Sequence, residues 1–307
     1  MDPVPVVIDT DPGIDDVVAL ALALRSPELD VAAVVTSYGN STLDRTTRNA
    51  HRLLEILGRT GVPVIPGVDR PLSRALVTAP EAHGPSGVGH APVLPAPAIE
   101  PDPDALLWAL DGCARPVVLI TLGPLTNLAL ALERDAPLLR RRVTRHLGMF
   151  GSLRERGNTN RWADFNAWCD PEAAERVLDA QLGTVMVGLD VTRRMTFAAG
   201  DVAGFARSAD PLVGWLGAAL QFYVEFHRSQ GRLDGCVVHD VLPVGELLAP
   251  GLLTLAQRRI RVDLDEGEHR GHTVEYTHGA PTEVALGVDI PRMGALLARV
   301  FRPGTGA

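Results

Sequence analysis

The sequence predicts an α/β fold: a mainly parallel sheet flanked by helices, with a helical lid-like insertion and a C-terminal β-hairpin. Short apolar runs alternate with segments of helical periodicity from Val4 to Leu189, which favours parallel strands joined by helices. Hydrophobic residues make up 46% of the chain, enough for a large core. The last third changes character, with one long helical segment followed by a candidate hairpin.

The first part of the chain contains the alternating elements. Strands are expected at residues 4–8, 31–36, 62–65, 116–121, 146–150 and 184–189. Helices are expected at residues 15–24, 42–57, 103–112, 125–132 and 171–180. Pro27 and Gly58 follow the first two helices, where such residues commonly end a helix. Residues 67–100 are rich in Gly, Pro and His and predict a long loop region.

The remaining elements belong to the last third. Residues 212–228 predict a long helix within a lid-like insertion around residues 198–238. Residues 258–264 and 272–276 predict a β-hairpin around the sequence DEGEHRG, and residues 290–301 predict a closing helix. Because no linker or internal repeat is visible, we expect residues 1–307 to form one domain.

Composition argues against several classes of partner. The net charge of −8 disfavours nucleic acid, and the basic cluster at residues 140–145 falls late in a predicted helix, where arginines stabilise the C-terminus. No run of about 18 uninterrupted apolar residues predicts a membrane span, and no basic segment at the N-terminus indicates a signal peptide. The cysteines lack metal-type spacing, so we expect a reduced, cytoplasmic protein.

Aspartates crowd the end of the first expected strand in the segment VVIDTDPGIDD. Ligands bind at the carboxyl ends of the strands in such sheets. Asp15 and Asp16 can also stabilise the start of the next helix, but this does not explain Asp9 or Asp11. Crowded carboxylates need a cation or raised pKa values. Oxygen ligands without Cys or a nearby His favour Ca²⁺ or Mg²⁺, and a metal-bound water is a ready nucleophile.

The D-x-D pattern in this segment leaves an alternative open. In aspartyl-phosphate enzymes the first Asp of such a pair attacks phosphorus, so Asp9 or Asp11 would be the nucleophile of a Mg²⁺-dependent phosphohydrolase. The chain contains no lysine to bind a phosphate, and a cation at that position is normally needed. A non-catalytic nucleoside- or ribose-binding protein is the third hypothesis.

The sequence as a whole resembles the inosine–uridine preferring nucleoside hydrolases. The segments that carry this resemblance are DTDPGIDDVVAL, SYGNSTLDRTTRNA, HGPSGVG, LGPLTNLALAL, GNTNRWADFNAWCDPEAA, VGLDVT and VVHD. The resemblance implies a Rossmann-like α/β fold and a tightly bound Ca²⁺. It also implies hydrolysis of the N-glycosidic bond of ribonucleosides to ribose and free base.

The resemblance carries the calcium ligands over by position. It implies that the carboxylates of Asp11, Asp16 and Asp240 and the backbone carbonyl of Leu122 bind Ca²⁺. It further implies that Asp11 is the general base for the attacking water. A backbone ligand tolerates any side chain, so the leucine is no objection.

Ribose contacts are implied in the same way: Asp15 for the 2′-hydroxyl, Asn166 and Asp240 for the 3′-hydroxyl, and Asn158 and Asp164 for the 5′-hydroxyl. Asn40 is expected near the ribose, and Phe150 stands where a methionine of the family often lines the ribose pocket. Asp164 replaces the Glu of the family pattern and is one methylene shorter.

His239 is expected near the leaving base, where a proton donor helps departure. His83 lies in a family-like HG loop, and Tyr223 and His227 are one helical turn apart on the expected long helix, so all three are candidates to face the base. Members of the family commonly have an aromatic residue about seven positions before the histidine that corresponds to His239, and this chain has Arg232 there.

These observations predict a Ca²⁺-dependent ribonucleoside hydrolase of nucleoside salvage. A carboxylate cage suits this reaction, because positive charge develops on the sugar in the transition state. We expect a small-molecule ribonucleoside substrate and a homodimer or homotetramer.

Overall fold

The computed structural model describes residues 2–93, 95, 98–231 and 233–301. Residues 94, 96 and 97 of the expected loop region, and Arg232, lie outside the described residues. A nine-stranded sheet forms the centre, with the strand order β10-β9-β11-β6-β5-β4-β1-β2-β3. From β11 to β3 neighbouring strands pair in parallel, whereas β9 is antiparallel to β10 and β11. The predicted fold class is therefore confirmed.

The strands of this sheet are short at both edges and longest near its antiparallel end. They are β1 (Val4–Thr10), β2 (Leu29–Thr36), β3 (Val64–Pro66), β4 (Val117–Thr121), β5 (Val143–Gly148), β6 (Thr184–Met186), β9 (Leu253–Val262), β10 (Thr273–Glu275) and β11 (Ala280–Val288).

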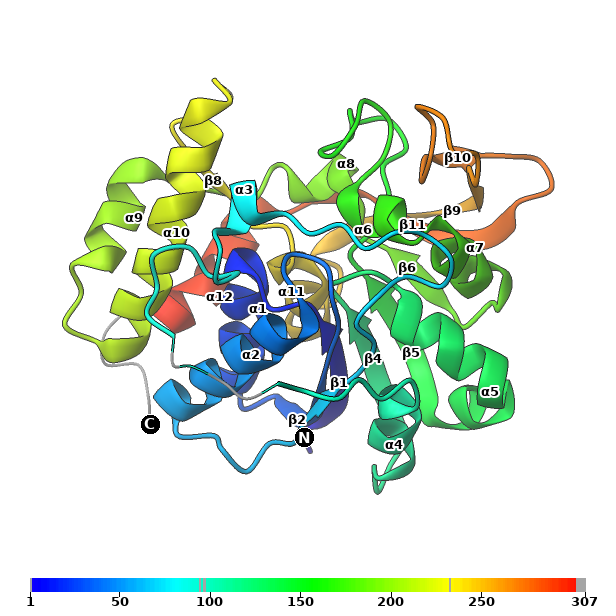
Figure 1. Cartoon of the computed structure of the whole chain (residues 1–307), viewed down its shortest axis with the longest axis horizontal. Helices are drawn as coiled ribbons and strands as arrows, with labels where there is room; N and C mark the ends of the chain where they lie inside the picture. The colour runs from blue at the N-terminus through cyan, green and yellow to red at the C-terminus, as the bar shows by residue number, and fades with distance from the viewer. Residues whose placement is uncertain (1, 94, 96–97, 232, 302–307) are drawn as a thin grey trace.

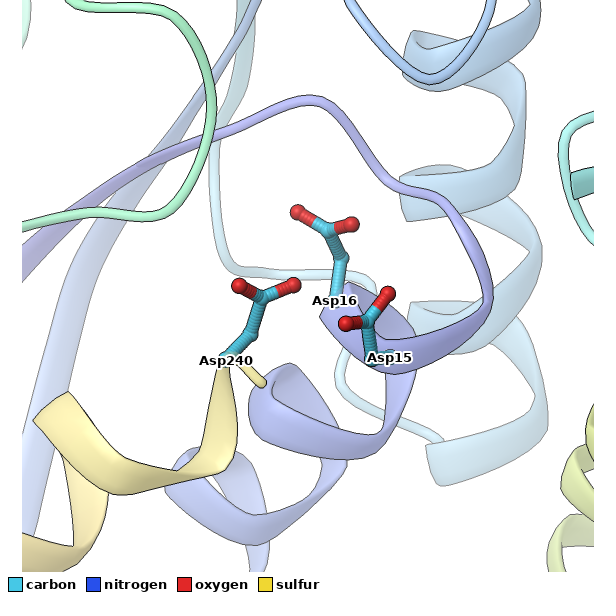
Figure 2. Close-up of side chains that lie close together, drawn as sticks. All are labelled: Asp15, Asp16 and Asp240. Atoms are coloured by element: carbon cyan, nitrogen blue, oxygen red, sulfur yellow. The ribbon is translucent and has the colours of Figure 1, made fainter. Parts of the chain in front are cut away.

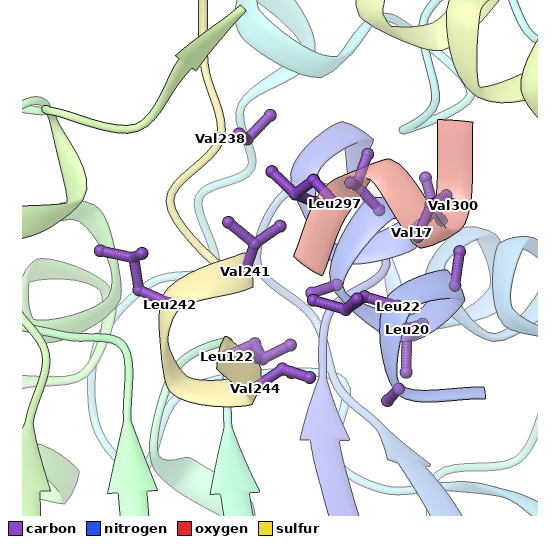
Figure 3. Close-up of a cluster of buried hydrophobic side chains, with 14 of the residues drawn as sticks. Val17, Leu20, Leu22, Leu122, Val238, Val241, Leu242, Val244, Leu297 and Val300 are labelled. Atoms are coloured by element: carbon purple, nitrogen blue, oxygen red, sulfur yellow. The ribbon is translucent and has the colours of Figure 1, made fainter. Parts of the chain in front are cut away.

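Helices cover both faces of the sheet (Figure 1). They are α1 (Ile14–Arg25), α2 (Leu43–Leu57), α4 (Ala105–Asp111), α5 (Thr126–Arg142), α7 (Pro171–Asp179), α11 (Val241–Leu248) and α12 (Ile290–Phe301). Side chains alternate between the two cores along β1: Val6 and Ile8 enter one core and Val7 the other. Figure 3 shows part of the first core, in which apolar side chains of α1, α11 and α12 meet.

The predicted lid-like insertion is a helical hairpin. Within residues 198–238 it contains α9 (Ala199–Ala206), α10 (Pro211–Ser229) and β8 (Gly235–Val237), and it is preceded by α8 (Leu189–Thr192) and β7 (Thr196–Ala198). Antiparallel pairing of β7 with β8 joins its two ends. The long helix α10 begins where Asp210 accepts hydrogen bonds from the amides of Leu212 (2.9 Å) and Val213 (3.0 Å), with Pro211 in the first turn.

Some boundaries differ from the prediction. The strand expected at residues 184–189 ends at Met186, because Leu189 already begins α8. The helix expected at residues 125–132 continues past a kink at Asp135 to Arg142. The predicted hairpin exists as β9 and β10, but β11 pairs with β9 as well, and neither β11 nor α11 was expected from the sequence. None of the described helices is both long and apolar enough to cross a membrane.

Candidate active site

The carboxylates of the N-terminal segment meet Asp240 above the end of β1. Asp15 and Asp16 lie in the first turn of α1, and Asp240 is the residue immediately before α11. Figure 2 shows the three side chains close together at the two helix starts. Each offers an oxygen within 4.8 Å of the others, and all three are buried. This cluster joins residues far apart in the sequence.

Asp11 lies beside this cluster and is held on one side only. Its Oδ2 accepts a hydrogen bond from the Asn40 amide at 2.7 Å, while its buried Oδ1 has no hydrogen-bond partner. The backbone approaches it closely, since a Cβ added to Gly123 would lie 2.5 Å from Oδ1. Asp16 is fixed by the Thr10 hydroxyl (2.5 Å), the Gly13 amide (3.0 Å) and the Asn40 side-chain amide (2.8 Å).

Burial and mutual repulsion work against ionisation of these acids. Burial, followed by the charge of Asp16, raises the pKa of Asp15 to about 7. Burial and then Asp16 raise the pKa of Asp11 well above its usual range, and burial and then Asp15 do the same for the pKa of Asp240. A bound cation would remove this cost, because it stabilises the charged form of every carboxylate around it.

The donor atoms fit a hard cation. Apart from the carboxylates, Leu122 lines the same cleft, and its carbonyl accepts a hydrogen bond from the Asn166 side-chain amide at 2.6 Å. Its second lone pair remains for another partner. Oxygen donors of this kind, together with the unpartnered Asp11 Oδ1, match the ligands that Ca²⁺ and Mg²⁺ prefer.

A cleft opens above the carboxylates and contains most of the expected site residues. Asp11 and Asp16 lie beneath its surface. The expected residues that line the cleft are Asp15, Asn40, His83, Leu122, Asn158, Asp164, Asn166, Tyr223, His227, His239 and Asp240. Sequence reasoning missed Met149, Phe226, Trp168 and the segment 77–79, which line it too.

Asp164 and Asn166 are placed by the short helix α6 (Phe165–Cys169). The Asp164 carboxylate accepts hydrogen bonds from the amides of Gly151 (2.6 Å), Ala167 (3.0 Å) and Asn166 (3.1 Å), and it thereby caps the helix. The Asn166 side-chain amide donates to the carbonyls of Leu122 (2.6 Å) and Met149 (2.8 Å). Its Oδ1 is consequently the atom available to a ligand.

Phe150 does not line the cleft, which corrects the expectation from the sequence. Its fully buried ring belongs to the second core, and a Cβ added to Gly148 would lie 2.9 Å from it. Met149 faces the cleft instead. The two neighbours pack on opposite sides of the sheet, because Met149 belongs to the first core and Phe150 to the second.

Three histidines and a tyrosine surround the other end of the cleft. His83 ends the short helix α3 (Pro80–His83), where its Nδ1 accepts a hydrogen bond from the Ile14 amide at 3.1 Å. Its ring centroid lies 5.3 Å from that of Tyr223. On α10, His227 Nδ1 donates to the Tyr223 carbonyl at 2.8 Å.

His239 lies between this aromatic end and the carboxylates. Its Nδ1 is 2.8 Å from the Thr192 hydroxyl, and its backbone amide donates to Asp15 Oδ2 at 3.1 Å. Burial, followed by the nearby His227, lowers the pKa of His239 to about 3. Burial likewise lowers the pKa of His83 to about 3. Both rings are therefore neutral at neutral pH.

Comparison with known proteins now assigns the family. The model of the inosine-uridine preferring nucleoside hydrolase family matches residues 6–295. The chain belongs to this family. As a nucleoside hydrolase it is an enzyme that acts on ribonucleosides, so the resemblance drawn from the sequence is confirmed, and the phosphohydrolase and binding-protein hypotheses are not supported.

Individual relatives of this nucleoside hydrolase cover nearly its whole length. A protein of Enterobacter sp. (strain 638) named pyrimidine-specific ribonucleoside hydrolase RihA is 39% identical over 298 residues, which is 94% of each chain. A plant nucleoside hydrolase, PpNRh1, superposes with a TM-score of 0.89 at 32% identity and covers 98% of this chain and 100% of its own. The purine-preferring ribonucleoside hydrolase from Gardnerella vaginalis gives 0.87 at 26% identity, covering 97% and 98%.

Proposed function

We propose that this enzyme is a Ca²⁺-dependent hydrolase that releases ribose and free base from ribonucleosides. The observation that carries the calcium proposal is the buried group of Asp11, Asp15, Asp16 and Asp240. Four carboxylates in one dry site repel one another unless a cation balances them. Asp11, Asp16, Asp240 and the Leu122 carbonyl are the proposed ligands. The ion, when bound, would supply a Lewis acid beside the attacking water and the ribose hydroxyls.

Asp11 is the proposed general base. The Asn40 amide fixes its Oδ2, and its Oδ1 has no protein partner, so this oxygen is free to take a proton. The other site carboxylates stabilise the positive charge that develops on the sugar in the transition state more than they stabilise the neutral substrate. The same group therefore serves both water activation and charge stabilisation.

The remaining cleft residues are proposed to hold the ribose. Asp15 would bind the 2′-hydroxyl, while Asn166 Oδ1 and Asp240 would bind the 3′-hydroxyl. Asn40 would stand near the ring. The Asp164 carboxylate already accepts hydrogen bonds from backbone amides, so Asn158 is proposed as the main partner of the 5′-hydroxyl.

His239 is the proposed donor to the departing base. Because its ring is neutral, a Thr192 hydroxyl that donates to Nδ1 would leave the proton on Nε2, which can then hydrogen-bond to the base. Tyr223, His83 and His227 are proposed to surround the base. Relatives that are 37–39% identical are named pyrimidine-specific, so we propose uridine and cytidine as better substrates than inosine.

The decisive experiment measures free ribose after incubation of the purified enzyme with uridine, cytidine and inosine. Ribose should form with Ca²⁺ present and stop after chelation, and Asp11→Asn should lose nearly all activity. The 2′-deoxy analogue of uridine should be a very poor substrate, because it lacks the hydroxyl that Asp15 is proposed to bind. Ribose release that is unaffected by chelation, or equal kcat/KM for uridine and 2′-deoxyuridine, would refute the assignment.

Three further properties remain proposals. We propose one domain over residues 1–307, a cytoplasmic location, and assembly into a homodimer or homotetramer, since closed symmetric oligomers are common among soluble enzymes. Sedimentation equilibrium of the purified enzyme tests the last of these, and a monomer at micromolar concentration would contradict it.

A further inference from the structure

The loop before α6, residues 152–163, brings a side chain to the cleft and is compact at its tip. Asn158 lines the cleft from this tip. The Gly157 amide donates to the Arg161 carbonyl at 2.9 Å, and the Asn158 amide donates to the Ala163 carbonyl at 3.2 Å. Asn160 Oδ1 accepts hydrogen bonds from the backbone amides of Trp162 and Ala163, each at 2.7 Å. Residues 157–163 therefore move together, and whatever holds one side of the tip also places Asn158.

Trp162 belongs to the same tip but is not among the residues that line the cleft. Its indole stacks on His269, with ring centroids 4.8 Å apart and an interplanar angle of 20°, and lies 5.4 Å from the ring of His272. The Arg161 guanidinium lies 5.0 Å from the indole centroid. The indole Nε1 is buried without a hydrogen-bond partner. The indole is therefore held by packing contacts rather than by a hydrogen bond of its Nε1.

Both histidines belong to the β9–β10 connection, residues 263–272. Figure 1 shows this orange segment next to the green loop before α6. The same connection holds a second wall of the cleft: the Arg270 guanidinium lies 4.3 Å from the Trp168 ring centroid and donates to the Cys169 carbonyl at 3.1 Å. Trp168 lines the cleft, whereas the connection itself contributes no residue to its lining.

A third wall is attached to the connection through Arg74. Its guanidinium donates to the Leu264 carbonyl at 2.6 Å and pairs with Glu172 on α7. The segment that follows, residues 77–79, lines the mouth of the cleft. The β9–β10 connection therefore contacts three segments that contribute residues to the cleft: the loop before α6 through Trp162, helix α6 through Trp168, and the segment before residues 77–79 through Arg74.

We propose that the β9–β10 connection positions the substrate at its 5′ end, with Trp162, His269 and His272 as positioning residues that set where Asn158 stands. This inference rests on the proposed function, because it takes the 5′-hydroxyl as the partner of Asn158. The start of the loop has its own anchor, since the amides of Leu153 (2.9 Å) and Arg154 (2.8 Å) donate to Asp190. The tip is also tied by the Arg193 guanidinium, which donates to the Gly157 carbonyl at 2.8 Å, and by the Asn160 side-chain amide, which donates to the Arg270 carbonyl at 3.4 Å. Loss of the ring stack should therefore shift the tip, and Asn158 with it, without freeing the whole loop.

The kinetic test compares uridine with 5′-deoxyuridine in matched variants. Trp162→Ala should lower kcat/KM for uridine by about 10-fold, mainly through KM, because misplaced binding groups weaken alignment of the substrate. The same variant should change kcat/KM for 5′-deoxyuridine by less than about twofold, since that substrate lacks the affected contact. His269→Ala combined with His272→Ala should reproduce this pattern, and Trp162→Phe should restore most of the loss.

Trp108→Ala is the matched control, because Trp108 is an exposed tryptophan on α4 that does not line the cleft. It should leave both substrates unaffected. Equal losses on uridine and 5′-deoxyuridine in Trp162→Ala would overturn the positioning role, and so would full activity on both.

Proteolysis supplies a readout that does not depend on activity. Trypsin should cut the loop after Arg154, Arg156 or Arg161 faster in Trp162→Ala than in the wild type, at an unchanged melting temperature. An unchanged cleavage rate would overturn the inference. Failure of the proposed function has a different signature, because the wild type would then release no ribose from any nucleoside. In that case the cleavage rates still decide whether the connection holds the loop.

Discussion

Asp11 depends on the absence of a side chain at two neighbouring positions. A Cβ on Gly39 would lie 2.0 Å from its Oδ2, and a Cβ on Gly123 would lie 2.5 Å from its Oδ1. Gly39 also has a φ of +152°, which other residues rarely adopt, whereas Gly123 has no such constraint. A substitution at Gly123 therefore tests the steric contact with Asp11 without adding backbone strain, whereas a substitution at Gly39 would do both.

We expect Gly123→Ala to displace the Asp11 carboxylate while the fold persists. Activity should fall by about 10²-fold or more, since a shift of about 1 Å in a catalytic group costs that much. Ribose release and circular dichroism should be measured on the same preparation. Gly61→Ala is the control, because a Cβ there meets nothing within 4 Å. Wild-type activity in Gly123→Ala would show that Asp11 is not held as described.

His239→Ala tests the leaving-group assignment at the same scale. The loss of kcat should be about 10²-fold for uridine, at the lower end of general acid catalysis, because the neutral ring is a weak donor. A nitrophenyl riboside should be affected far less, since its phenolate departs without protonation. Thr192→Val should show the same selectivity in milder form. Equal losses on both substrates would instead assign His239 to support of Asp240.

At the scale of elements, helix starts bring the site together. The first turn of α1 carries Asp15 and Asp16, α6 carries Asn166, and Asp240 immediately precedes α11. In a parallel sheet, the loops that lead from strands into helices lie at one edge. The partial positive charge of these helix starts also favours carboxylates there. The parallel sheet thus assembles the site from separate segments.

A buried histidine links the three central strands β4, β5 and β6. His146 Nε2 lies 2.9 Å from the Thr121 hydroxyl, and Nδ1 lies 3.0 Å from the Thr184 hydroxyl. Burial lowers the pKa of His146 to about 3. Between that value and an unfolded pKa of about 6.5, the unfolded chain binds the extra proton, so the free energy of unfolding falls as the pH drops through this window.

We therefore expect His146→Gln to flatten the acid dependence of stability. The contribution removed should approach about 1.4 kcal/mol per pH unit below pH 6. Urea unfolding at pH 7, 6 and 5 measures it, with exposed His278→Gln as the control for loss of a histidine. The same slope in wild type and His146→Gln would mean that His146 takes up a proton in the folded protein.

At the scale of the whole molecule, the two ends of the cleft come from different parts of the fold. The carboxylates lie at the sheet, whereas Tyr223 and His227 come from α10 in the insertion, which packs against α1 and α3. In the proposed binding mode, separate layers of the fold would therefore bind the ribose and the base. Substitutions on α10 are expected to alter base preference more than they alter the metal site.

Calcium should stabilise the whole molecule if the cluster is its site. A ligand present at 100 times its dissociation constant adds about 2.7 kcal/mol to the free energy of unfolding. The melting temperature should rise with Ca²⁺ and fall on chelation, and Asp16→Asn should lose most of this response. A surface change, Asp2→Asn, should retain it. A melting temperature that does not respond to Ca²⁺ in the wild type would contradict the proposed ligand set.

The sequence by itself determined the α/β class and the N-terminal half of the site. Alternation of strands and helices is a local pattern, and Asp11, Asp15 and Asp16 share one strand-to-helix turn, so their proximity follows from chain connectivity. Asp240, Asn166 and His239 could be assigned only through the family resemblance, because no local rule brings distant segments together. The short strands β7 and β8 and the helix α11 carry too little periodicity to be distinguished from loop.

Tertiary structure decided which neighbouring side chains face the cleft and what supports them. Met149 rather than Phe150 lines the cleft, because Phe150 packs into the second core beneath the sheet, and which of the two neighbours enters that core depends on how the helices pack around them. The stacking of Trp162 on His269 likewise has no trace in the sequence. Such contacts arise when separate elements pack, and packing depends on the positions of all elements at once rather than on local residue patterns.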